Sequence, residues 1–179
     1  MTGTYHGLLI RRIVNRLYYG DSVMFADPRR DEMAHATNDV LRVLNQSGCY
    51  TVRVDMSHLA SVDELARLIM SQVSVLGGVA VPVPATANQI DPFVAVEDAL
   101  DAMEGVARRG DKRLVCVMEE FGDAERIGGD PLWNAMRTMM QRHEYAVYLF
   151  TGSDVDLMRS IFADYQRALY SFATILHLP

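Results

Sequence analysis

The sequence predicts an α/β fold, a three-layer sandwich with about five parallel strands and helices on both faces of the sheet. Short apolar runs alternate with amphipathic helical patterns along the chain, which is typical of a parallel sheet. The run from Arg113 to Met118 is almost continuously apolar, as a central strand buried on both faces requires. With 179 residues, of which 50% are hydrophobic, the chain suits one core domain over residues 1–179.

In the first half of the chain, the spacing of apolar residues defines the elements and turn residues separate them. Gly20 ends the first helical pattern, and Ser61 with Glu64 forms a capping-box signature that starts a later helix. The predicted elements are a helix over 6–19, a strand over 22–26, a helix over about 32–47, a strand over 50–55 and a helix from 61 to about 76.

Two Asp-Pro pairs in the second half of the chain predict helix starts, because Asp caps a helix and Pro suits its first position. Segment 77–90 has no period and two prolines, so we expect a mobile loop there. We expect residues 151–153 to form a turn. The predicted elements are a helix from Asp91 to about Arg109, a strand over 113–118, a helix from Asp130 to His143, a strand over 146–150, a helix over about 155–162 and a strand over 174–178.

Composition excludes some functional classes. The formal charge of -6 disfavours non-specific binding of nucleic acid, and the arginines of the first thirty residues are better interpreted as a solvated helix face than as a basic patch. No apolar run is long enough to span a membrane. Cys49 and Cys116 form no motif and fit a reducing cytoplasm, so we expect a cytoplasmic protein.

Residues 25–34 lie between a strand and a helix, where a phosphate-binding loop belongs, but they lack its chemistry. A working loop needs glycines that expose backbone N–H groups, a lysine for the outer phosphates and a hydroxyl for magnesium. Glu32 and Met33 stand at the Gly-Lys positions, and Ala34 replaces the hydroxyl. The only lysine of the chain is Lys112, far along the sequence.

Three segments, in this order and spacing, resemble the archaeal-type P-loop ATPases of the AAA+/STAND group, from about Leu17 to Pro179. They are Pro28-Arg29-Arg30 after the first strand, Val117-Met118-Glu119-Glu120-Phe121, and Gly152-Ser153 after a later strand. Family members continue into a helical lid and usually a winged-helix domain, which we expect this chain to lack. The resemblance implies remnants of a nucleotide site at Pro28, Arg29, Arg30, Glu32, Met33, Ala34 and Ser153, of a metal ligand at Glu119 and of a general base at Glu120.

The charged residues of this region admit competing interpretations. Asp31 or Glu32 is more simply a cap on the helix N-terminus than part of a phosphate site. Arg29 and Arg30 either bind an anion or pair with neighbouring acids, and the sequence does not separate these. We interpret Glu119 and Glu120 as remnants rather than as a metal ligand and base. A bare cation held by Asp27 and these two glutamates would have too few ligands to bind tightly.

The functional hypothesis is a catalytically inactive ATPase-like domain that acts as a protein-interaction or regulatory module. No cofactor is expected, and the partner is another protein or a second copy of the chain. The expected contact surfaces are the N-terminal helix, the loop over 77–90 and an apolar face that a lid would have covered. The alternatives are a nucleotide-binding protein or weak ATPase that binds ATP and Mg²⁺ with Arg29 or Arg30 in place of the lysine, and a DNA-associated module.

Overall fold

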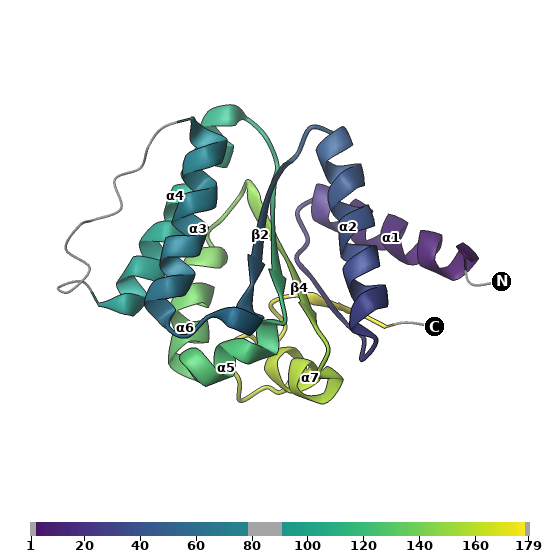
Figure 1. Cartoon of the computed structure of the whole chain (residues 1–179). Helices are drawn as coiled ribbons and strands as arrows, with labels where there is room; N and C mark the ends of the chain where they lie inside the picture. The colour runs from purple at the N-terminus through teal and green to yellow at the C-terminus, as the bar shows by residue number, and fades with distance from the viewer. Residues whose placement is uncertain (1–2, 79–90, 178–179) are drawn as a thin grey trace.

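The computed structural model describes residues 3–78 and 91–177, with side chains from His6 onward (Figure 1). Its strands are β1 (Val23–Ala26), β2 (Tyr50–Asp55), β3 (Leu114–Glu119), β4 (Ala146–Gly152) and β5 (Thr174–Leu176). Its helices are α1 (Gly3–Tyr18), α2 (Arg30–Gln46), α3 (Val62–Gly77), α4 (Pro92–Gly110), α5 (Ala124–Ile127), α6 (Gly129–Met140) and α7 (Val155–Ala163), with 3₁₀ turns at Met56–His58 and Phe121–Asp123.

The five strands form one sheet in the order β2-β3-β4-β1-β5, and every neighbouring pair is parallel. The register aligns Ala26 with Gly152 and Asp55 with Glu119, so the carboxyl ends of β1 to β4 lie along one edge. We call this the carboxyl edge and the opposite one the amino edge. The predicted parallel sheet of about five strands is confirmed.

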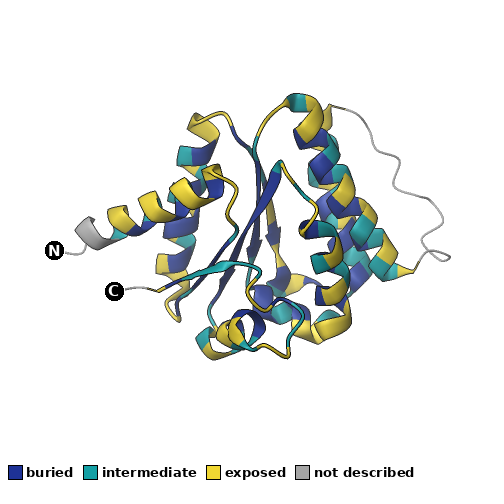
Figure 2. Cartoon of the chain, turned by 180° about the vertical axis from the view of Figure 1, so that it is seen from behind, coloured by how far each residue is buried: buried dark blue, intermediate teal, exposed yellow. Residues whose placement is uncertain are grey.

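Helices cover both faces of the sheet, as a parallel sheet requires (Figures 1 and 2). On one face, α1 and α2 bury Leu9, Ile13 and Val40 against β1, β3, β4 and β5. On the other face, α3, α4, α6 and α7 surround a larger core that includes Trp133 and Phe150. The three-layer sandwich predicted from the alternating pattern is therefore the observed architecture.

The caps of α3 and α4 follow the sequence signals. The Ser61 hydroxyl accepts a hydrogen bond from the Glu64 backbone at 3.3 Å, and the Asp91 carboxylate accepts one from Phe93 at 2.9 Å. The predicted loop over 77–90 begins one residue too early, because Gly77 still belongs to α3 and Gly78 caps the helix with a left-handed φ of 62°. The remaining residues of that loop, 79–90, lie outside the described part of the chain.

Several boundary predictions were wrong, and the last strand, predicted over 174–178, ends at Leu176. Helix α6 begins at Gly129 rather than at an Asp130 cap, because the Asp130 carboxylate pairs with Arg167 at 3.2 Å instead. It also ends at Met140, and the ring of His143 hydrogen-bonds the Tyr148 hydroxyl at 2.7 Å. Thr151 and Gly152 belong to β4 rather than to a turn.

Close packing, rather than a turn, explains the glycine at position 152. A Cβ atom there would lie 2.7 Å from the Met158 side chain of α7, closer than carbon atoms approach without displacement. Helix α7 therefore packs directly on the backbone at the end of β4.

Candidate functional site

The topology marks one position on the carboxyl edge as the natural binding site of the sheet. Strand β1 leads into α2 on one face, whereas its neighbour β4 leads into α7 on the other. Ligands of open α/β sheets bind at such a switch point, outside the carboxyl ends of the strands. The predicted site segments meet there: the loop after β1, Glu120 after β3, and Ser153 after β4.

The loop after β1 is short and uses its own backbone donors. It consists of Asp27, Pro28 and Arg29, because α2 starts at Arg30. The N–H of Asp27 donates to the Gly152 carbonyl at 3.3 Å, and the N–H of Arg29 donates to the Asp27 carboxylate at 2.8 Å. Pro28 has no N–H. No loop amide is therefore left to bind a phosphate group.

Asp27 is the anion that fills this turn. Only 2% of its surface is exposed, and the Arg29 guanidinium donates to both its carboxylate oxygens, at 3.0 and 2.8 Å. Burial by itself would raise the pKa of Asp27, but the hydrogen bonds and charge of Arg29 outweigh burial and hold that pKa below its ordinary value. Arg29 also pairs with Glu32 at 2.9 Å, so its charge is shared between two acids.

The helix cap differs from the prediction. Neither Asp31 nor Glu32 caps α2, because the N-cap residue is Arg29, which makes no side-chain capping bond. Both acids lie in the first turn of α2, where their charge complements the helix dipole. The acid that saturates the loop is instead Asp27, which lies before the helix.

Arg30 closes the other side of the site. Its Nε donates to the Ser153 hydroxyl at 3.0 Å and lies 3.7 Å from a Glu120 carboxylate oxygen. Ser153 in turn donates to Glu120 from its backbone at 3.1 Å and from its hydroxyl at 2.8 Å. Arg30, Glu120 and Ser153 therefore form one polar network, although Arg30 itself is largely exposed.

Glu119 belongs to a separate network that the sequence analysis missed. Arg53 of β2 donates to both its carboxylate oxygens, at 2.5 and 2.7 Å, and to Asn38 of α2 at 2.8 Å. The alternation in β2, with Val52 and Val54 in the core, places Arg53 on the α2 face. The alternation that places Arg53 on this face is visible in the sequence. Its partner Glu119 is identified only when β2 and β3 are known to be neighbours.

Three other predicted site residues have structural environments. The side chain of Met33 is 5% exposed and packs in the core under α1 and α2, so it does not reach the carboxyl edge as a lysine would. Ala34 is half-buried in the first turns of α2. Pro28 lines a cavity of about 200 Å³ between β1, β5 and α7, together with Met24, Ala26, Val155, Arg159, Ile175, Leu176 and His177.

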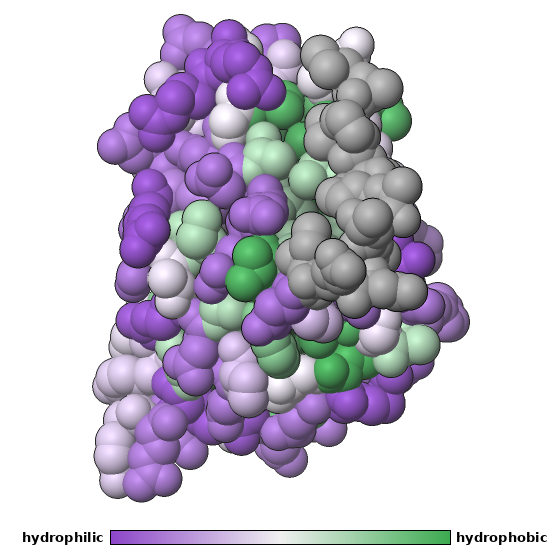
Figure 3. All heavy atoms as spheres, turned by 90° about the vertical axis from the view of Figure 1, so that its left-hand side faces the viewer, coloured by the Kyte–Doolittle hydropathy of each residue, from purple (hydrophilic) through white to green (hydrophobic). Residues whose placement is uncertain are grey.

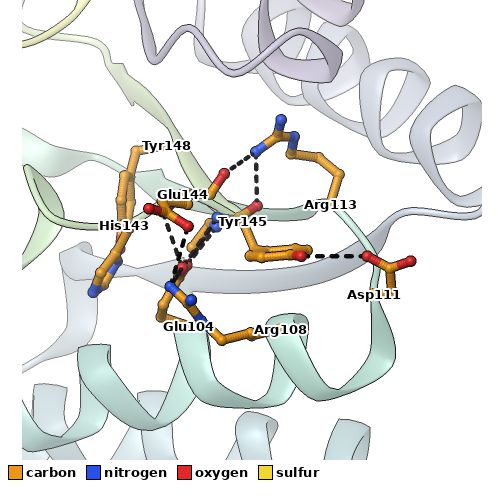
Figure 4. Close-up of polar contacts among 9 residues, drawn as sticks. Glu104, Arg108, Asp111, Arg113, His143, Glu144, Tyr145 and Tyr148 are labelled. Carbon is orange, nitrogen blue, oxygen red and sulfur yellow. Dashed lines mark hydrogen bonds and ion pairs between the residues drawn. The ribbon is translucent and has the colours of Figure 1, made fainter.

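A second polar cluster lies at the amino edge (Figure 4). Glu104 of α4 is 5% exposed, and its carboxylate accepts hydrogen bonds from the backbone N–H groups of Glu144, Tyr145 and Ala146 at 2.8 to 3.1 Å. Arg113 donates to the carbonyl of Glu144 at 2.6 Å and to that of Tyr145 at 3.2 Å. The loop before β4 is therefore held through both its donors and its acceptors.

Over residues 3–78 and 91–177, no group of three or more His, Cys, Asp or Glu side chains is arranged to hold a metal ion. In particular, Asp27, Glu119 and Glu120 point into separate networks with Arg29, Arg53 and Ser153, respectively. No helix in the same ranges is long and apolar enough to cross a membrane.

Comparison with solved structures finds the same architecture in other proteins. The Walker-type ATPase of Pyrococcus abyssi superposes with a TM-score of 0.70 at 13% identity, covering 94% of this chain and 51% of that one. The ADP form of the Aeropyrum pernix ORC2 protein gives 0.62 at 18% identity, covering 99% and 47%. The Aeropyrum pernix ORC1 protein in complex with DNA gives 0.57 at 13% identity, covering 97% and 45%.

These likenesses confirm the expected fold, a three-layer α/β sandwich like that of a P-loop ATPase. The chain spans about half the length of the structures that it matches. No protein-family profile matches the sequence, and no curated protein matches it either.

Proposed function

We propose that this chain is an ATPase-like domain without nucleotide chemistry, acting as a protein-interaction or regulatory module. The observation that carries the proposal is the saturated loop after β1. Its two N–H groups already have acceptors within the protein, and its third residue is a proline. A phosphate-binding loop works through free backbone N–H groups, and this loop offers a triphosphate none of its own. The first-turn N–H groups of α2 lie beside the acidic residues Asp31 and Glu32, whose charge opposes a second anion there.

The charges around the loop support the same proposal. Arg29 and Arg30, the residues that could replace the missing lysine, are already paired with Asp27, Glu32 and Glu120. Lys112 lies next to β3 at the amino edge, with its Nζ over the Tyr50 ring at 4.9 Å. A triphosphate at the switch point would have to break these ion pairs and approach three carboxylates, which repel it.

Titration calorimetry with Mg-ATP tests the proposal. We expect no saturable heat up to about 1 mM nucleotide, corresponding to a binding free energy weaker than about -4 kcal/mol. The Arg30→Ala variant serves as the matched control, since the rival weak ATPase would use this side chain. Micromolar binding by the natural chain that is lost in Arg30→Ala would overturn the proposal, and nucleotide and Mg²⁺ would then be its cofactors.

The interaction role rests on what the exposed surface offers. The site itself is polar, and the large exposed apolar residues of the described chain lie outside it, so an apolar face at the switch point is not supported. The side bearing α3 and α4 mixes hydrophilic and hydrophobic residues (Figure 3). In the described part of the chain, the large exposed apolar residues are Leu8, Tyr18, Tyr19, Val75, Val94, Tyr165 and Tyr170.

A DNA-associated role is the second candidate. Structures of this fold include the Aeropyrum pernix ORC1 protein in complex with DNA and Drosophila ORC bound to AT-rich DNA and Cdc6. The exposed arginines of α1 would contact the DNA, whereas the net charge of -6 of the whole chain opposes its binding. Duplex DNA binding that weakens steeply with salt would support this candidate, and no binding at low salt would exclude it.

The cytoplasmic location also remains a proposal. The two cysteines, Cys49 and Cys116, are buried free thiols, which suits a reducing compartment.

A further inference from the structure

The outward face of α1 is a positively charged stripe on a negatively charged protein. Leu8, Arg11, Arg12 and Arg16 recur at helical spacing, and all four are exposed, whereas Leu9, Ile13 and Leu17 face the core. Residues 3–19 contain no acidic residue, although the whole chain has a formal charge of -6. Figure 2 shows the exposed residues along the outer side of this helix.

The stripe is mostly unpaired. Among the described residues, Arg11 and Arg12 make no ion pair or side-chain hydrogen bond, and Arg16 has only an exposed pairing with Asp21 at 3.3 Å and a long bond to Thr174 at 3.5 Å. Two adjacent arginines without acids beside them repel one another and attract an anionic surface. The α1 stripe also repels a second α1, so it does not dimerise with itself.

The opposite side of the molecule carries the complementary pattern on α4. Val94 is 43% exposed, and Glu97, Asp98 and Asp101 follow it at spacings of three, four and seven residues. In the described chain, none of these three acids forms an ion pair or side-chain hydrogen bond, whereas the buried Glu104 of the same helix is fully engaged. On α1, Arg11 and Arg12 follow Leu8 at the same spacings of three and four.

The two stripes also match in length. At a rise of about 1.5 Å per residue, the α4 stripe from Val94 to Asp101 is about 10 Å long and the α1 stripe from Leu8 to Arg16 is about 12 Å long. Each begins with an exposed aliphatic side chain and continues with charges of one sign. Aliphatic contact flanked by opposite charges is the arrangement of a small protein interface rather than of a phosphate-backbone contact.

We infer that a second copy of this chain docks its α4 stripe on the α1 stripe, head to tail. Because α1 and α4 cover opposite faces of the sheet, a chain cannot join its own two stripes (Figure 1). The contact is therefore heterologous, and it leaves one free stripe at each end, so that copies add to form short chains or a closed ring. The small contact and its exposed ion pairs make this association weak, transient and sensitive to salt.

This inference names a partner for the interaction role proposed above, but it does not depend on the nucleotide site. Sedimentation velocity from about 10 μM to about 1 mM protein at low salt tests it. We expect the weight-average sedimentation coefficient to rise with concentration, and the apparent association constant to fall at least about tenfold at about 0.5 M salt.

Charge reversal makes the test specific to the two stripes. Arg11→Glu with Arg12→Glu, or Asp98→Arg with Asp101→Arg, should each abolish association, whereas all four substitutions in one chain should restore it with exchanged polarity. Arg142→Glu with Arg159→Glu is the control, since it changes the net charge as Arg11→Glu with Arg12→Glu does, at exposed positions outside both stripes.

Three results would overturn the inference. The first is a natural chain that stays monomeric at about 1 mM and low salt. The second is association that survives both pairs of reversals, or that the four-fold variant does not recover. The third is binding of duplex DNA through Arg11 and Arg12 without self-association, because the α1 stripe would then serve a nucleic acid.

Discussion

The two edges of the sheet hold their acidic groups in opposite ways. At the amino edge, three consecutive backbone N–H groups surround the Glu104 carboxylate. At the carboxyl edge, arginine side chains hold Asp27 and Glu119, and Ser153 with Arg30 holds Glu120. Asp27 and Glu120 there accept from one backbone N–H each, and the loop after β1 has no free N–H. Binding of one anion by several consecutive backbone amides, which phosphate loops use, therefore occurs here at the edge away from the switch point, and the anion is a side chain of the protein itself.

This difference separates an acid that stabilises the fold from acids that lie at the switch point. Glu104 is buried and satisfies donors that would otherwise lie unpaired inside the protein, so it contributes mainly to folding. The arginines of the carboxyl edge are more exposed, at 44% for Arg53, 55% for Arg29 and 71% for Arg30, so their pairs cost less to open. Variants at the two edges test this difference.

The largest effect is expected at the amino edge. Glu104→Ala removes the acceptor of three backbone N–H groups and should lower the free energy of unfolding by about 3–5 kcal/mol. Urea denaturation followed by circular dichroism measures this loss. Glu97→Ala, on the same helix without a partner among the described residues, should change stability by less than about 0.5 kcal/mol. Equal losses in the two variants would remove the distinction between the edges.

A smaller effect on stability, with a change in binding, is expected at the carboxyl edge. Asp27→Asn keeps the size of the side chain but removes the charge that holds Arg29, and should cost about 1–3 kcal/mol of unfolding free energy. It also leaves Glu32 as the one ion-pair partner of Arg29 among the described residues, so inorganic phosphate should bind this variant beside the start of α2 more tightly than the natural chain. Asp31→Asn, which removes an exposed first-turn charge, is the control. Unchanged phosphate affinity in Asp27→Asn would mean that Asp27 does not occupy an anion position.

The smallest expected effect is on the pH dependence of stability, which also differs between the two edges. Burial lowers the pKa of His143 at the amino edge, so the unfolded chain takes up this proton first and stability falls as pH drops below about 6.5. Burial opposes ionisation of Asp27 and Glu104, but hydrogen bonds keep the pKa of each below its ordinary value. These two carboxylates contribute fully to the free energy of unfolding above the ordinary carboxyl pKa. The contribution is lost as the pH falls through their lowered pKa values.

Two variants assign these pH ranges to their residues. His143→Gln should flatten the stability profile between about pH 5 and 7, and Asp27→Asn should reduce the loss below about pH 4. Denaturant titrations at several pH values measure both profiles. If the loss of stability above pH 5 persists unchanged in His143→Gln, another titrating group causes it.

The sequence predicted the fold and much of the location of the site, because both depend on local patterns. Alternating periods and Asp-Pro or Ser-x-x-Glu signals identified the main strands and helices, and the segments at Pro28, Glu120 and Ser153 do meet at the switch point. The short helix Ala124–Ile127 escaped prediction, since it is one turn without a periodic face.

What the sequence could not predict are the partners of the charges. Asp27 and Arg29 are two residues apart, yet only the turn geometry brings both guanidinium bonds onto the buried carboxylate. The pairing of Arg53 with Glu119 depends on the neighbouring positions of β2 and β3, and the Glu104 contacts join α4 to a loop forty residues away. Such contacts are set by sheet order and helix packing, which periodicity does not encode.

The most direct measurement is an amide NMR titration of the isotope-labelled chain with Mg-ATP to about 5 mM, a range that detects even millimolar dissociation constants. If the loop after β1 is saturated by Asp27, the resonances of Asp27, Arg29, Arg30, Gly152 and Ser153 should keep their positions throughout. Saturable shifts confined to these amides, absent in Arg30→Ala, would show that a triphosphate displaces the internal carboxylate and that the domain still binds nucleotide.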